Sequence, residues 1–210
     1  RCDRIALIQK GRILDIASTQ LSDGTCYHQY QPLTKKGNAD IGGGFNDDPL
    51  WLILSTCAYI RETGDVAILE EPCGYADKPG SKDTLHHHLE TSIAYTLNHR
   101  GPHKLPLIGH ADWNDCLNLN CFSKEPNESF QVTGDIEGSK AESVMIAGLF
   151  LYATRDLAGL YRWMGRDVDA KRVDSHYADM LETIESQAWD GGRYTRAFDA
   201  ESKPVGSKVC

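Results

Sequence analysis

One stretch of the sequence combines residue types that could do chemistry, Pro106-Leu-Ile-Gly-His-Ala-Asp-Trp-Asn-Asp-Cys-Leu-Asn-Leu-Asn120. Two carboxylates, Asp112 and Asp115, follow an apolar run and lie on either side of the indole of Trp113. The stretch also carries three amides, Asn114, Asn118 and Asn120. An indole face stacks on the C–H side of a pyranose, amides and carboxylates bind its hydroxyls, and a carboxyl group can protonate a glycosidic oxygen. We therefore predict a carbohydrate site. In the alternative interpretation, Asp112 or Asp115 caps a helix and Trp113 packs beneath it.

The overall charge and composition exclude several other classes of function. The net charge of -8 argues against nucleic acid and against anionic membrane surfaces, because both bind basic patches. No run approaches the roughly 20 apolar residues of a membrane span, and the longest, residues 144–153, suits a buried helix. The seven cysteines are odd in number and lack CxxC spacing, which argues against a disulfide framework or a zinc ribbon. We expect reduced thiols and a cytoplasmic protein.

Five helices are predicted to position the candidate stretch. Apolar periodicity and apolar runs give residues 4–20, 50–60, 83–98, 139–163 and 166–186. Long polar loops are expected at 25–46 and 121–137, an irregular connection at 70–81, and a short hairpin in 189–198. The first loop has the aromatic and polar mix of a binding loop, but a loop that only covers the core fits equally well.

Two local patterns bear on possible binding groups. Asn46-Asp-Asp-Pro49 predicts the start of a helix, because an Asp N-cap satisfies unpaired amides and proline suits the first helical position. We expect one of Asp47 and Asp48 to cap this helix and the other to face the site, and we assign substrate binding to Asp48. The run His86-His-His88 lies on a predicted helix, where adjacent residues point about 100° apart, so it cannot chelate one metal ion. Exposed histidines and no metal site are predicted.

The order of the elements indicates an all-α fold. Helices that are apolar nearly all round alternate with helices that are apolar on one face, as expected when an inner ring packs inside an outer ring. This pattern predicts part of an (α/α)6 toroid, whose long loops form the site at one end. A complete toroid of six helix pairs needs more helices than these, so residues 1–210 are interpreted as a fragment of one such domain.

Several motifs are long enough to compare with known families. They are Gln29-Tyr-Gln-Pro-Leu-Thr34, Gly42-Gly-Gly-Phe-Asn-Asp-Asp-Pro-Leu-Trp-Leu52, Leu105-Pro-Leu-Ile-Gly109, Ala111-Asp-Trp-Asn-Asp-Cys-Leu-Asn-Leu-Asn-Cys-Phe-Ser123, Trp189-Asp-Gly191 and Arg196-Ala-Phe-Asp199. Together they resemble the cellobiose phosphorylases, inverting glycoside phosphorylases of glycoside hydrolase family 94. The resemblance covers essentially the whole chain. It implies the (α/α)6 catalytic domain of a longer enzyme that also carries an N-terminal β-sandwich domain.

The resemblance implies a reaction and roles for individual residues. Cellobiose and phosphate would give α-glucose 1-phosphate and glucose with inversion. Asp115, the second aspartate of the Asp-Trp-Asn-Asp motif, would be the general acid, and Trp113 would line the glucose subsite at the cleaved bond. Substrate binding is also assigned to three neighbours, Asp112, Asn114 and Asn118. Inorganic phosphate would be the only co-substrate, with no metal or organic cofactor, and a homodimer is common in the family.

The implied chemistry places a requirement on Asp115. Phosphate is already an anionic nucleophile, so no second carboxylate base is needed. Asp115 must carry its proton before the reaction, so its pKa must be raised from about 3.9 by burial and nearby negative charge. Asp112 and the bound phosphate are the candidate sources of that charge.

Departures from the family leave alternatives open. The family often has Arg where this chain has His110. Its sugar-binding Arg and Asp are expected upstream of Arg1, and its phosphate and acceptor residues downstream of Cys210, so we expect the chain alone to be inactive. The alternatives are a cellodextrin or chitobiose phosphorylase, an inverting toroid hydrolase with Asp47 or Asp48 as the base, and a non-catalytic sugar-binding helical module.

Overall fold

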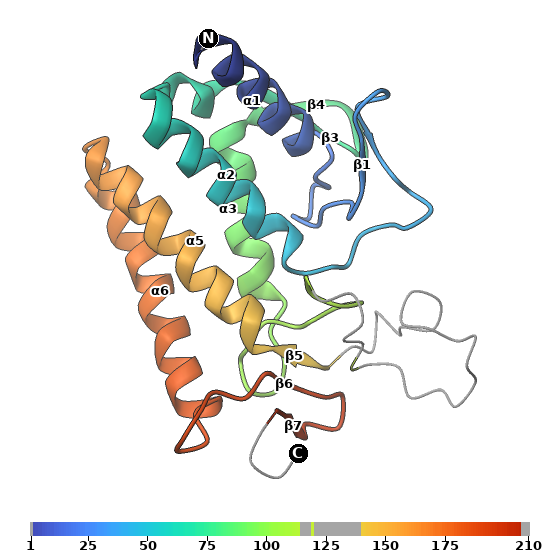
Figure 1. The fold of residues 1–210 in the computed structure, drawn as a ribbon, viewed down its shortest axis with the longest axis vertical. Helices are drawn as coiled ribbons and strands as arrows, with labels where there is room; N and C mark the ends of the chain where they lie inside the picture. Colours follow the sequence, from blue (N-terminus) through green and yellow to red (C-terminus); the bar gives the residue numbers. More distant parts are fainter. Residues whose placement is uncertain (1, 114–118, 120–139, 207–210) are drawn as a thin grey trace.

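The computed structural model describes residues 2–113, Leu119 and residues 140–206, and the protein is mainly helical within them (Figure 1). The five α-helices of this part are α1 (Cys2–Ala17), α2 (Asp48–Thr63), α3 (Leu85–Asn98), α5 (Val144–Trp163) and α6 (Asp167–Gln187). A short 3-10 helix, η1 (Val66–Glu70), follows α2. The five predicted helices are therefore confirmed, with ends shifted by a few residues.

The helices form a packed layer with α2 in its middle. Helix α2 packs against α1, α3 and α5, and α5 forms an antiparallel hairpin with α6 (Figure 1). The largest fully buried side chains include Tyr161 and Phe150 of α5, Leu50 and Ile53 of α2, and Leu89 of α3. The core thus lies where α5 crosses α2 and α3.

Helices α5 and α6 differ as the sequence predicted. Helix α5 is long and apolar enough, by length and composition alone, to cross a membrane, but 61% of its most apolar window is buried inside the structure. Its apolar surface therefore serves the core on several sides. Helix α6 buries one face, made by Ala170, Val173, Met180, Thr183 and Ile184.

The strands are short, and one hairpin was not predicted. Strands β3 (Pro72–Tyr75) and β4 (Lys78–Thr84) pair antiparallel where the sequence suggested an irregular connection. That prediction is wrong because every residue of β4 except the last is exposed, so no alternation of apolar and polar residues marks the strand. Strands β1 (Tyr30–Gln31) and β2 (Lys36–Gly37) pair within the long loop at 25–46.

A three-stranded sheet lies beside the N-terminus of α5. Its order is β5 (Glu142–Ser143), β6 (Ala197–Phe198) and β7 (Pro204–Val205), all antiparallel. The hairpin predicted in 189–198 is reduced to a single bridge between Trp189 and Tyr194. Strand β6 instead lies between β5 and β7. Its two residues are fully or nearly fully buried, so their backbone amides and carbonyls need hydrogen-bond partners on both sides.

The ends of α2 show how the sequence sets a helix boundary and where the prediction fails. Pro49 lies in the first turn, and Gly64 ends the helix with a left-handed φ of 71°. Asp47 is the N-cap residue, but its side chain makes no capping hydrogen bond. The predicted capping role is therefore wrong: the carboxylate accepts a hydrogen bond from the indole Nε1 of Trp51, at 2.9 Å, one turn further on.

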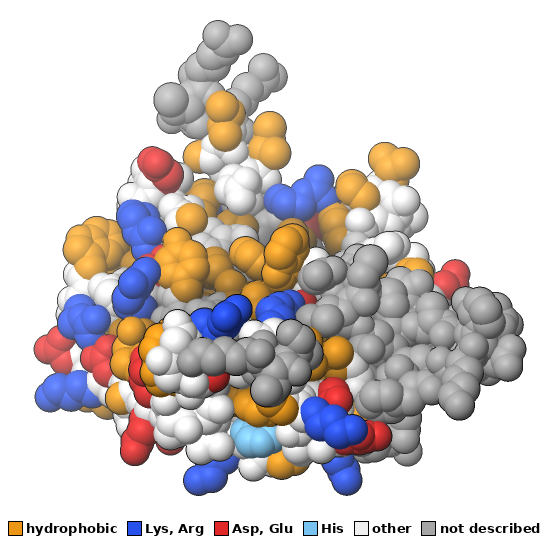
Figure 2. All heavy atoms as spheres, turned by 60° about the horizontal axis from the view of Figure 1, so that its bottom comes forward, with side chains coloured by type: hydrophobic (Ala, Val, Ile, Leu, Met, Phe, Trp, Pro, Cys, Tyr) orange, Lys and Arg blue, Asp and Glu red, His pale blue; other side chains and the backbone are white. Residues whose placement is uncertain are grey.

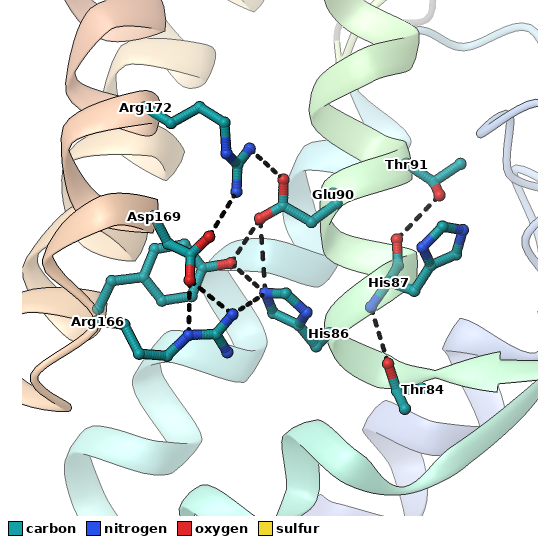
Figure 3. A network of polar contacts seen from close by, with 9 residues as sticks. Thr84, His86, His87, Glu90, Thr91, Arg166, Asp169 and Arg172 are labelled. Atoms are coloured by element: carbon teal, nitrogen blue, oxygen red, sulfur yellow. Dashed lines mark hydrogen bonds and ion pairs between the residues drawn. The ribbon is translucent and has the colours of Figure 1, made fainter.

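A polar network joins α3, α5 and α6 (Figure 3). The hydroxyl of Tyr161 donates to Glu90 at 2.6 Å, and Arg172 binds both Glu90 and Asp169. Burial opposes the charge of Glu90, but the hydrogen bonds from Arg172 and Tyr161 outweigh it and hold the pKa of Glu90 below its ordinary value. Polar contacts therefore take the place of apolar packing where α3, α5 and α6 come together, and they link the three helices to one another.

The histidine run on α3 differs from the prediction of exposed side chains. His86 lies in the same network, 2.8 Å from the hydroxyl of Tyr161, and only His87 points into solvent (Figure 3). His88 has no exposed surface, stacks on Tyr75 with ring centroids 4.3 Å apart, and binds Gln20 at 2.7 Å. In the residues that the structure describes, no cluster of His, Cys, Asp or Glu is placed to hold a metal ion.

Hydrophobic side chains also reach the surface, where they lie among charged ones (Figure 2). On α1, the side chains of Ile5, Leu7 and Ile8 are mostly exposed. Beside them, a groove of about 1020 Å³ runs between α1 and α2 and is lined by residues such as Ala6, Ser55 and Tyr59. The apolar face of α1 is therefore only partly covered by the described residues.

Candidate active site

The stretch at 106–113 is held by chain segments that are distant in sequence. At its centre, Gly109 forms an isolated bridge with Phe45, and the amide of His110 donates to the carbonyl of Gly44 at 2.8 Å. Gly109 has a φ of +70°, and a Cβ there would lie 1.9 Å from the carbonyl oxygen of Gly44. Only glycine fits this crossing, because both the backbone conformation and the space exclude a side chain.

Strand β5 supports the same stretch from the other side. The amide of Ser143 donates to the carbonyl of Pro106 at 2.9 Å, and the amide of Ile108 donates to Ala141 at 2.8 Å. Glu142 is fully buried and accepts from the amides of His103 and Leu105, at 3.0 and 3.1 Å. Burial raises the pKa of Glu142, although the nearby His103 counteracts this shift.

Asn46, the first residue of the Asn46-Asp-Asp-Pro49 motif, makes hydrogen bonds that hold the protein structure together. Its amide donates to the carbonyl of Leu107 at 2.9 Å and its oxygen accepts from the hydroxyl of Tyr95 at 2.8 Å. Burial raises the pKa of Tyr95 to about 12, which keeps this donor protonated. The segment before α2 and the stretch at 106–113 are thus linked through side chains as well as backbone.

Asp112 lies in a buried ion pair. Its side chain has no exposed surface, and both of its oxygens lie 2.7 Å from Nη2 of Arg196. One oxygen also accepts a hydrogen bond from the hydroxyl of Ser143 at 2.6 Å. That hydroxyl in turn accepts from the amide of Ile146 at 3.1 Å and caps α5. Direct contact of Asp112 with a sugar stays a prediction, since in the structure its carboxylate is engaged by the protein.

Arg196 was missed by reasoning from the site residues. It belongs to a quoted motif, but nothing in its local pattern connects it to Asp112, which is distant in sequence. The signal that could have found it is a general rule: a buried carboxylate needs a cation or several hydrogen-bond donors. The sequence does not show which carboxylate is buried, so the pairing requires the fold.

The side chains of Asp47 and Asp48 contact other side chains, and no capping hydrogen bond from Asp47 is present. Asp48, assigned to substrate binding, lies 3.1 Å from Nδ1 of His28, whose ring stacks on Phe45 with centroids 3.8 Å apart. Asp47 is 3% exposed, and its Oδ1 has no hydrogen-bond partner among the residues that the structure describes. Burial raises the pKa of Asp47, and the negative charge of Asp112 adds to this rise. Substrate binding by Asp48 stays a prediction, while Asp47 is a second buried carboxylate beside the site.

Trp113 follows the buried Asp112 and is 65% exposed. The alternative interpretation, in which its ring packs beneath a helix cap, is therefore wrong. An exposed indole next to a fixed backbone offers an apolar face on which a pyranose can stack. The other assigned residues, Asn114, Asp115 and Asn118, lie outside the described residues, as does Asn120.

His110, which replaces the arginine often found in the family, packs against the crossing at Gly109. Its ring lies over Gly44 and is tilted against Phe45, with centroids 5.5 Å apart. A small cavity of about 40 Å³ adjoins His110, Phe45 and Asp40, and within the described part of the chain Nδ1 of His110 has no hydrogen-bond partner. The cavity has room for one water molecule, the simplest partner for this nitrogen.

Comparison with known proteins gives a consistent set of relatives. A family model described as the catalytic domain of the glycosyl hydrolase 94 superfamily matches residues 6–210. Solabiose phosphorylase of Paenibacillus borealis is 30% identical over 201 residues, which is 95% of this chain and 23% of that protein. N,N'-diacetylchitobiose phosphorylase of Vibrio proteolyticus is 27% identical over 164 residues, 77% of this chain and 18% of that protein.

A third relative has a different substrate in its name. The 3-O-beta-D-glucopyranosyl-beta-D-glucuronide phosphorylase of Paenibacillus borealis is 27% identical over 163 residues, 77% of this chain and 19% of that protein. The chain therefore spans about a fifth of the length of the curated relatives it matches.

Proposed function

We propose a function from one premise: the chain belongs to the glycosyl hydrolase 94 superfamily, of whose catalytic domain it is a part. The protein that contains it would phosphorolyse a β-linked disaccharide reversibly, giving a sugar 1-phosphate. Three relatives are phosphorylases by name, which supports this reaction class over hydrolysis and over sugar binding alone. Their names cover different sugars, so the family does not fix the substrate.

Cellobiose is our proposed substrate, with α-glucose 1-phosphate and glucose as products and inversion at the anomeric carbon. The support is the resemblance of the motifs from Gln29 to Asp199 to those of cellobiose phosphorylases. A cellodextrin or chitobiose phosphorylase remains the alternative.

The proposed mechanism uses Asp115 as the general acid and phosphate as the direct nucleophile. Asp115 would donate its proton to the leaving glycosidic oxygen while phosphate attacks the anomeric carbon from the opposite face. Trp113 would stack on the glucose unit that is transferred. The observation that carries the proposal is the arrangement at Asp112 and Trp113: a buried, ion-paired anchor followed by an exposed indole, at the start of the Asp-Trp-Asn-Asp motif.

This arrangement changes one expectation about Asp115. Asp112 was a candidate source of the negative charge that keeps Asp115 protonated. Because Arg196 lies 2.7 Å from both oxygens of Asp112, most of that charge is compensated. Bound phosphate and burial are therefore the sources we propose for the raised pKa of Asp115.

The fold we propose for the whole domain is the (α/α)6 toroid, to which this chain contributes helices of both rings. The apolar groove between α1 and α2 and the exposed side chains of Ile5, Leu7 and Ile8 support this proposal, because further helices would cover them. A cytoplasmic location and a homodimer are also proposals. We expect the 210-residue chain alone to show no turnover.

The test is the phosphorolysis of cellobiose by the full-length protein and by its Asp115→Asn variant. Glucose 1-phosphate that forms only with phosphate present, and that falls by several orders of magnitude in the variant, supports the proposal. Free glucose without a requirement for phosphate would indicate a hydrolase. Sugar binding without either product would leave a non-catalytic binding module as the better description.

A further inference from the structure

We propose that Arg196 is a positioning residue of the active site, which acts on Trp113 through Asp112. The inference rests on the proposed function, because it assigns Trp113 and the chain after it to the reacting sugar. Arg196 itself would touch neither substrate nor phosphate. Its role would be to fix the point from which the Asp-Trp-Asn-Asp segment starts.

The contacts of Arg196 join three parts of the chain. One guanidinium nitrogen, Nη2, lies 2.7 Å from each oxygen of Asp112, and the other, Nη1, lies 3.3 Å from the hydroxyl of Ser143. The same hydroxyl donates to Asp112 and caps α5. Asp112 is thus held by a cation that immediately precedes β6 and by the N-cap residue of α5, two segments that are themselves paired through β5 and β6.

The backbone of Arg196 is fixed on both sides. Its amide donates to the carbonyl of Val205 at 2.8 Å, and its carbonyl accepts from the amide of Val144 at 3.2 Å. Gly206 lies against its Cβ, with a φ of +77°. The guanidinium therefore extends from a backbone that is held between β7 and the first residue of α5. We infer that this anchored side chain sets the position of the carboxylate.

The burial of Asp112 increases the effect of losing its ion pair with Arg196. Asp112 is fully buried, whereas the side chain of Arg196 is 30% exposed. When the cation is removed, the carboxylate is left in a site of low polarity, and it must take up a proton or move toward water. Movement would displace Trp113, the next residue. A displacement of about 1 Å can lower a catalytic rate roughly 100-fold.

A purely structural role for Arg196 makes different predictions. If the ion pair only stabilised the fold, Arg196→Ala would lower the melting temperature and the amount of folded enzyme, but folded molecules would turn over normally. If Arg196 positions the site, kcat per folded molecule falls and the environment of Trp113 changes. The pairing with Asp112 also predicts that the effects of Arg196→Ala and Asp112→Asn are not additive, since both break one contact.

The experiment uses the full-length protein with the variants Arg196→Ala, Arg196→Lys, Asp112→Asn and the double variant Asp112→Asn/Arg196→Ala. We expect kcat of Arg196→Ala to fall roughly 100-fold, with partial recovery in Arg196→Lys or on addition of guanidinium at non-denaturing concentrations. The double variant should be no slower than the slower single variant. Arg193→Ala, at an exposed position three residues earlier, is the matched control and should keep the wild-type rate.

A second readout does not require turnover. In protein labelled with 5-fluorotryptophan, the resonance of Trp113, assigned with Trp113→Phe, should shift in Arg196→Ala and stay in place in Arg193→Ala. An unchanged Trp113 resonance in Arg196→Ala would overturn the inference, as would a wild-type kcat per folded molecule. If the wild-type protein forms no glucose 1-phosphate, the proposed function fails, while the fluorine spectra still decide whether Arg196 positions Trp113.

Discussion

The crossing of Gly109 over Gly44 allows a sharp test of how the site is built. We consider Gly109→Ala, which places a methyl group 1.9 Å from the carbonyl oxygen of Gly44. A left-handed alanine costs about 1–2 kcal/mol. The overlap must also push the two chains apart and break the hydrogen bond between His110 and Gly44, worth about 1 kcal/mol. We therefore expect Gly109→Ala to lower the free energy of unfolding by about 2–3 kcal/mol.

Gly148→Ala is the matched control for this substitution. Gly148 lies in the interior of α5, it is exposed, and a Cβ there would meet nothing within 4 Å. Alanine in a helix is favoured over glycine by about 0.5–1 kcal/mol, so this variant should be more stable than the wild type. Parallel urea titrations of the full-length proteins, followed by intrinsic fluorescence, give the two midpoints. Shifts of the same sign, or a Gly109→Ala midpoint at the wild-type value, would refute the proposed crossing.

The other predictions concern the histidines, the network of Figure 3 and the exposed indole. Burial lowers the pKa of His86, His88 and His176, so these residues take up protons more readily when unfolded, and stability should fall as the pH drops below about 6.5. Melting curves between pH 8 and pH 5 should show this loss, and His88→Gln should reduce it. The pKa of Glu90 is instead held low in the folded protein. Its contribution to stability is therefore present above the ordinary carboxyl pKa and is lost as the pH falls through the pKa of the folded state. Glu90→Gln should remove that part of the acid dependence of the melting temperature, and an unchanged dependence would contradict the prediction. Trp113→Ala should raise KM for the disaccharide with little change in melting temperature, because the side chain is 65% exposed; a large loss of stability would mean that the ring packs in the core.

The helices were predictable because the pattern of apolar residues that indicates each helix lies within the helix itself. The apolar runs of α2 and α5 and the one-faced pattern of α6 are properties of neighbouring residues, and burial follows from them directly. The histidines of α3 show the limit of this reasoning. Spacing alone argued against a shared metal ion, which stays a prediction, and it could not show that His88 would be buried between Gln20 and Tyr75.

The candidate site was predictable in its residue types and not in its connections. The assignment of the site to the Asp-Trp-Asn-Asp motif stays a prediction, with which the exposed Trp113 is compatible. The partners of that stretch come from residues before α2, from β5 and from Arg196, which precedes β6, and no local pattern links these segments. Asp47 is the clearest case: its position before Pro49 suggested a helix cap, but the fold buries its carboxylate against the indole of Trp51.

The surroundings of three acidic residues bear on the alternative of an inverting hydrolase. An inverting hydrolase needs a second carboxylate that activates water, and Asp47 and Asp48 were the two candidates. Asp47 is 3% exposed, so it is poorly placed to hold a water molecule, although burial raises its pKa and would make its carboxylate a stronger base. Asp48 is bound to His28 at 3.1 Å. Asp112 is paired with Arg196, so each of these three carboxylates is buried or engaged by the protein. In the reaction that we propose, the anionic phosphate would need no general base.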